Sequence, residues 1–126
     1  MQPTAGQLQH LQRLAAMVLD YTPEIEHTGC DVEGHGPEII IDRTVAIWPT
    51  VTRVPPVVGE RLVPAWAVAL IVPDPPSRHE PPGESYTQQE THRSWLGAAG
   101  AAVHLLALAR LSAAIDSLAH STDGEC

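Results

Sequence analysis

The chain has no lysine, no asparagine and no phenylalanine among its 126 residues. Because the codons of these three amino acids are rich in A and T, their absence indicates a GC-rich bacterial or bacteriophage gene. All seven basic residues are arginines, scattered singly against fifteen acids, and the net charge is −8. A nucleic-acid-binding surface normally needs clustered basic residues. The sequence therefore predicts no direct contact with nucleic acid and no attraction to anionic lipid.

Cysteine is scarce as well. Cys30 and Cys126 are too few to form a disulfide framework. The opening sequence, MQPTAGQLQHLQRL, lacks the charged and apolar segments that make up a secretory signal. We therefore expect a reducing location, the cytoplasm of a bacterial host or a virion.

The length suits one hydrophobic core, so we expect a single α+β domain over residues 1–126. A helix is predicted from about Thr4 to Tyr21, because Thr4 and Gln7 have capping-box spacing and Pro23 disfavours further helix. The proline-rich segment 73–83 is predicted to be an exposed loop, and residues 121–126 a frayed tail.

The middle of the chain favours an antiparallel sheet of about three strands. Residues 24–32 form a weak strand candidate, and the turn-like GHGPE leads into the run EIIIDRTVAIW. Arg43 would interrupt the apolar face of that run, which indicates a bulge, a break or an edge. Residues 49–61 have the composition of a loop. The run at 65–72 is apolar on both faces, as expected for a central strand.

A long helix rich in alanine and glycine is predicted from Ser85 or Thr87 to about His120, packed on the sheet. The helix would be about 54 Å long, whereas the domain should be roughly 35 Å across. Either the helix breaks at Gly97 or Gly100, or part of it protrudes. A stripe at helical spacing is predicted to pack on the sheet; it consists of Leu96, Gly100, Val103, Ala107, Leu111, Ala114 and Leu118.

The first half of this helix is apolar on all sides. Its run of fifteen residues, in which His104 is the only polar side chain, is shorter than the ~20 predominantly apolar residues that a membrane span needs, so no membrane contact is expected. The second apolar side is covered either by the rest of a monomer or by another subunit, and we favour a homo-oligomer. The expected interface consists of Gly97, Ala98, Ala101, Ala102, Leu105 and Ala109.

Two further surfaces are candidates for contacts with other proteins. Seven acids between Asp20 and Asp42 form a negative segment, which either solubilises the chain or meets an arginine-rich partner. Its candidate residues are Glu24, Glu26, Asp31 and Glu33. The proline-rich loop offers an adaptable arm with Pro75, Pro76, Arg78, Pro81 and Pro82.

Motifs that would support catalysis are lacking. The sequence contains no phosphate-binding loop and no nucleophile elbow, and His27, Cys30 and His35 do not have a standard zinc spacing. We expect no catalytic residue, no metal and no cofactor. His104, inside the apolar helix, is expected to be a buried neutral imidazole.

These features favour a non-enzymatic assembly protein that binds copies of itself and other proteins of an assembly. Its small size and its order of helix, strands and helix resemble the layout of ring-forming proteins that join bacteriophage heads to tails or complete the tail. The alternative is an acidic inhibitory protein that occupies the nucleic-acid-binding surface of a partner.

Overall fold

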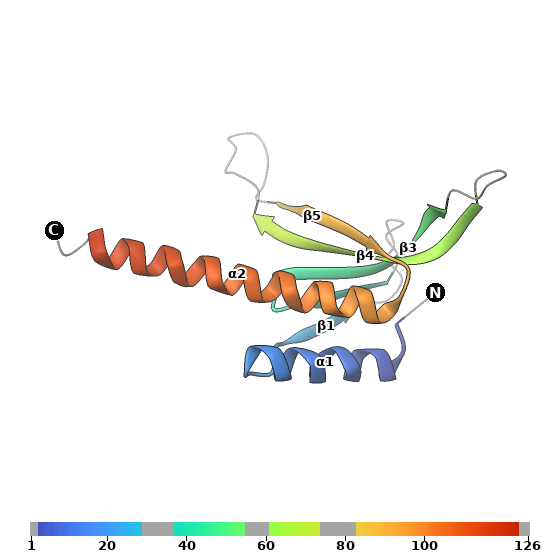
Figure 1. The fold of residues 1–126 in the computed structure, drawn as a ribbon, viewed down its shortest axis with the longest axis horizontal. Helices are drawn as coiled ribbons and strands as arrows, with labels where there is room; N and C mark the ends of the chain where they lie inside the picture. Colours follow the sequence, from blue (N-terminus) through green and yellow to red (C-terminus); the bar gives the residue numbers. More distant parts are fainter. Residues whose placement is uncertain (1–2, 29–36, 55–60, 74–82, 124–126) are drawn as a thin grey trace.

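The computed structural model describes residues 3–28, 37–54, 61–73 and 83–123 (Figure 1). A five-stranded antiparallel sheet has the order β1-β2-β3-β4-β5, with one helix before it and one after it. The α+β class is thus confirmed, but the sheet has five strands where about three were expected. The elements are α1 (Ala5–Leu19), β1 (Ile25–Thr28), β2 (Glu38–Ile41), β3 (Val45–Val54), β4 (Arg61–Pro73), β5 (Glu84–His92) and α2 (Trp95–Asp123).

Helix α1 begins at the predicted capping box. The Thr4 hydroxyl accepts a hydrogen bond from the Gln7 amide at 3.1 Å, and the Gln7 side chain accepts one from the Thr4 amide at 2.9 Å. The helix ends at Leu19, before the predicted end, because Asp20 adopts a left-handed conformation with φ of 60°.

The run predicted as one interrupted strand is a tight hairpin between β2 and β3. Asp42 and Arg43 have φ of 50° and 55°, and Ile41 pairs with Val45 across the turn. Two consecutive residues with positive φ are typical of the turns that match the twist of paired strands. The break expected at Arg43 is therefore confirmed.

Two assignments near β4 were wrong. Residues 49–54, predicted to lie in a loop, continue β3 and pair with residues 61–66 of β4. Residues 85–92, predicted to begin the last helix, belong to β5, which pairs with the other side of β4. An extra residue in β5 produces a register shift opposite Val68 and Leu70, and Gln88 has φ of 53° there.

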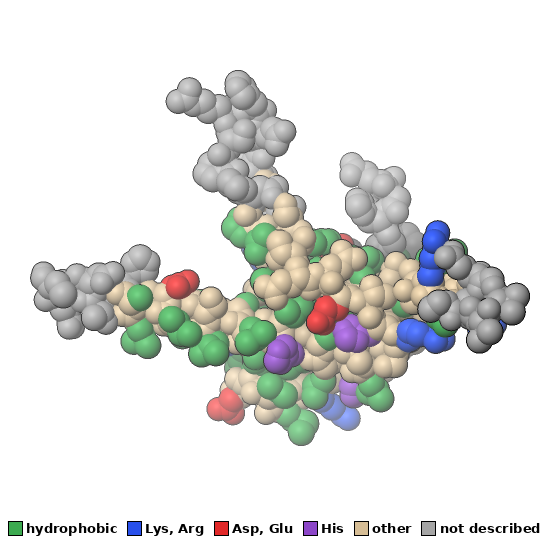
Figure 2. All heavy atoms as spheres, turned by 45° about the horizontal axis from the view of Figure 1, so that its top comes forward, with side chains coloured by type: hydrophobic (Ala, Val, Ile, Leu, Met, Phe, Trp, Pro, Cys, Tyr) green, Lys and Arg blue, Asp and Glu red, His purple; other side chains and the backbone are tan. Residues whose placement is uncertain are grey.

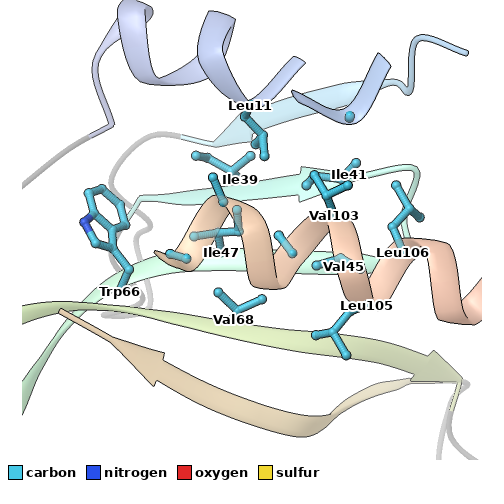
Figure 3. Packing of buried hydrophobic residues seen from close by; sticks show 14 residues of the cluster. Leu11, Ile39, Ile41, Val45, Ile47, Trp66, Val68, Val103, Leu105 and Leu106 are labelled. Carbon is cyan, nitrogen blue, oxygen red and sulfur yellow. The ribbon is translucent and has the colours of Figure 1, made fainter. Parts of the chain in front are cut away.

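Both helices pack on the same face of the sheet and run in the same direction (Figure 1). Leu11 of α1 meets Ile39 and Ile41 of the sheet, and Val103 and Leu106 of α2 complete the cluster (Figure 3). Trp66 and Trp95 lie edge to face at 5.0 Å between ring centroids, which fixes the start of α2 against β4.

The face of α2 that packs on the sheet differs from the predicted one. Among the predicted stripe only Val103 is fully buried; Leu96, Leu111 and Leu118 are 68%, 57% and 69% exposed. Three alanines, which let the helix approach the sheet closely, take the inner position together with three larger side chains. The buried α2 residues are Ala98, Ala99, Ala102, Val103, Leu105 and Leu106.

Candidate functional site

Helix α2 is continuous and extends well beyond the sheet and α1 (Figure 1). Its 29 residues correspond to about 44 Å, and neither Gly97 nor Gly100 breaks it. Every residue from Arg110 to Ala119 is exposed. Of the two possibilities left open by the sequence, protrusion is the one adopted. We call residues 110–123 the projecting half.

Apolar side chains follow one side of α2 along both the packed part and the projecting half. Gly100 and Ala114 lie exposed between the large side chains, and Ala107 is half-buried. Figure 2 shows hydrophobic side chains along one side of the projecting half. This surface is called the outward stripe; it comprises Leu96, Gly100, Ala107, Leu111, Ala114, Ile115 and Leu118.

The six residues expected to form an interface occupy other positions. Ala98, Ala102 and Leu105 lie in the core of the single chain, where the sheet already covers them. Gly97, Ala101 and Ala109 are half-buried. The side with Leu111 and Leu118 keeps large apolar residues beyond Arg110, but the spacing alone does not show which apolar side of the helix faces the sheet.

The base of the projecting half is anchored by side chains from three elements. The Tyr21 hydroxyl donates a hydrogen bond to the Asp42 carboxylate, whose other oxygen accepts one from the Glu24 amide at 2.8 Å. The guanidinium carbon of Arg110 lies 4.2 Å from the centre of the Tyr21 ring. Burial, and then the hydrogen bond to Asp42, raise the pKa of the Tyr21 hydroxyl. This contact holds α2 where it leaves the body.

A groove of about 460 Å³ lies where α2 separates from the sheet. Leu70 and Ile71 form the sheet side, while Leu105, Leu108 and Asp116 form the helix side. The groove is open and mainly apolar, and it contains no cluster of titratable groups among the described residues.

The other predicted sites are only partly described. Glu24 is exposed and Glu26 is half-buried beside a small hollow that Arg43 also lines. Asp31, Glu33, Cys30 and His35 lie outside the described residues, as do Pro75, Pro76, Arg78, Pro81 and Pro82.

His104 was predicted to be buried, and this prediction was wrong. Its side chain is exposed, because it lies on the side of α2 that faces away from the sheet. Within the described ranges no group of three histidine, cysteine or acidic side chains could hold a metal ion.

The chain was expected to have no membrane contact, and the length of α2 is relevant to that expectation. Residues Trp95–Ala119 are long and apolar enough to cross a membrane by length and composition alone. The core helix of a water-exposed domain passes the same test, and the first half of α2 contributes to the core.

Comparison of the chain with protein-family models, with curated proteins and with solved structures found no match.

Proposed function

We propose that the chain is a non-enzymatic protein that binds a second copy of itself through the outward stripe and takes part in a larger assembly. The observation that carries the proposal is the projecting half of α2, in which every residue from Arg110 to Ala119 is exposed and Leu111, Ile115 and Leu118 lie on one side. Isolated helices of this length are only marginally stable in water. Covering the stripe would stabilise the segment.

The stripe also fits association better than catalysis. Its large side chains are spaced by three and four residues, which is the spacing that helices use when they pack against each other. None of the residues of the outward stripe is titratable. A component of the kind that joins bacteriophage heads to tails would have a comparable size and order of elements, and this narrower assignment is part of the proposal.

The test is the solution mass of the purified protein, measured by light scattering after size exclusion at two salt concentrations. We expect a discrete multimer that survives high salt, because apolar contacts are not weakened by screening. Leu111→Glu should give a monomer with unchanged circular dichroism. Ser117→Glu, which adds the same charge on another side of the projecting half, should leave the multimer intact.

A monomer at both salt concentrations would overturn the proposal. It would favour the alternative, an acidic protein that binds the nucleic-acid-binding surface of a partner. That alternative predicts salt-sensitive binding that is lost when Glu24, Glu26, Asp31 and Glu33 are replaced by glutamine or asparagine.

A further inference from the structure

We infer that self-association through the outward stripe is regulated by pH, because covering the stripe removes the His104 imidazole from water where the stripe offers no carboxylate. This inference rests on the proposed function and adds a regulation of the same surface. It holds for either relative direction of the two paired helices.

His104 lies within the span of the outward stripe. It comes four residues after Gly100 and three before Ala107, and these spacings place side chains on one side of a helix. The His104 side chain is exposed. The residues one turn away in either direction carry no polar side chain; they are Gly100, Ala101, Ala107 and Leu108. A surface that covers Gly100 and Ala107 therefore also covers the imidazole.

The charged side chains of α2 itself lie on other sides of the helix. Between Trp95 and Ala119 there are two, Arg110 and Asp116. The Arg110 guanidinium lies over the Tyr21 ring, and Asp116 lines the groove between α2 and the sheet. Neither is three or four residues from His104, so neither is its neighbour along the helix.

The other elements contact α2 on its inner side. These are α1, β3, β4 and β5. Within them, the charged groups and histidines whose side chains the structure describes are His10, Arg13, Arg53, Arg61, Glu90 and His92. The His92 ring reaches α2 at Gly97, about 10 Å along the helix from His104. The one acid of this set, Glu90, lies 3.3 Å from the His92 Nε2. It is thus placed beside His92 rather than beside His104.

Burial against a second copy favours the neutral form of His104. The surface that covers it is the outward stripe of that copy, which contains no carboxylate in either orientation. An imidazolium that loses water without gaining an anion is disfavoured. Histidine ordinarily gains its charge between pH 8 and 5, so association should weaken as the pH falls through this range. Because each pair of chains buries two imidazoles, we expect Kd to rise roughly tenfold from pH 7.5 to 6.0.

The net charge of the chain predicts the opposite sign. The charge is −8 with neutral histidines, and protonation of histidines makes it less negative. Repulsion between copies therefore decreases as the pH falls. Weaker association at pH 6.0 is thus specific to an imidazole that the contact buries.

The test is Kd for self-association of the full chain, measured by light scattering on dilution series at pH 7.5 and 6.0 and constant salt. We expect the rise in Kd for the wild type and equal Kd values at both pH values for His104→Gln. His27→Gln is the matched control, because it removes an exposed imidazole from β1. The control should keep the response of the wild type to pH.

The outcomes separate this inference from the proposed function. A multimer whose Kd is unchanged or lower at pH 6.0 retains the proposed function and contradicts the regulation by His104. A response to pH that persists in His104→Gln contradicts it as well. A loss of circular dichroism that accompanies dissociation would assign the effect to unfolding and would also overturn the inference. A monomer at both pH values contradicts both proposals.

Discussion

The guanidinium of Arg110 lies over the ring of Tyr21, with 4.2 Å between the guanidinium carbon and the ring centre. Tyr21 follows α1, and its hydroxyl donates to Asp42 in the β2–β3 turn. One aromatic side chain therefore connects α2 to both the first helix and the sheet. Beyond this contact α2 extends from the body, so the pair marks the base of the projecting half.

Replacing Tyr21 with phenylalanine removes the hydrogen bond to Asp42 and keeps the ring beneath Arg110. We expect a loss of about 1 kcal/mol in the free energy of unfolding, measured by urea denaturation. Tyr86→Phe is the matched control, since Tyr86 is more exposed than Tyr21 and its hydroxyl donates to Glu38. The control should lose less stability; an equal loss in both variants would contradict the anchoring role of Tyr21.

The stabilisation from Tyr21 should also depend on pH. Its pKa is raised in the folded protein from an ordinary value of about 10 by burial and by Asp42, so folding favours the protonated hydroxyl. The contribution is fully present below pH 10 and is lost as the pH rises through the folded pKa. The difference in unfolding free energy between the wild type and Tyr21→Phe should therefore be constant from pH 7 to 9 and shrink above pH 10. A difference that grows with pH would contradict this assignment.

Substitutions of Ala102 and Ala113 test where α2 stops packing on the sheet. Ala102 is fully buried against the sheet, whereas Ala113, on a similar side of the same helix, is exposed at the groove. Ala102→Asp should cost several kcal/mol, because it buries a carboxylate without a partner. Ala113→Asp should change stability by less than about 1 kcal/mol. Thermal denaturation of both variants at one protein concentration measures the difference.

Sequence patterns were sufficient where local chemistry decides the structure. The capping box at Thr4 and Gln7 and the break at Arg43 both depend on neighbouring residues, and both are confirmed. Ser85 and Thr87 have equally good capping spacing, yet they lie in β5. The apolar strand β4 needs a pairing partner on each side, and this tertiary requirement overrides the local helix signal.

The outward stripe was only partly predictable, because its position also depends on tertiary packing. Helical spacing identified the stripe from Leu96 to Leu118, but it did not show which apolar side of α2 faces the sheet. The sheet takes the side with Ala98 and Ala102, because small side chains allow close packing of a helix. Leu105 and Leu106 also lie in the core, whereas Leu96, Leu111 and Leu118 are left exposed. The choice depends on the shape of the sheet surface, which the spacing of residues along one helix does not encode.

The start of α2 offers a fourth prediction. The Ser94 hydroxyl accepts a hydrogen bond from the Gly97 amide at 3.0 Å, and the Ser94 carbonyl accepts one from Ala98 at 3.1 Å, so Ser94 caps the helix. Ser94→Ala should lose about 1 kcal/mol and Ser94→Asp should retain most of the stability. Equal stability of the alanine variant and the wild type in urea denaturation would contradict the capping role.

If the outward stripe binds a second copy, thermal stability should depend on protein concentration. Association that occurs only between folded chains shifts the unfolding equilibrium by mass action, so Tm should rise as the protein is concentrated. Leu111→Glu should abolish that dependence, while Ser117→Glu should preserve it. At high dilution the wild type and Leu111→Glu should converge to similar Tm values, because Leu111 is more than half exposed in the single chain and contributes little to its core. A large difference that persists at dilution would mean that Leu111 stabilises the monomer itself, and the concentration dependence would then need another explanation.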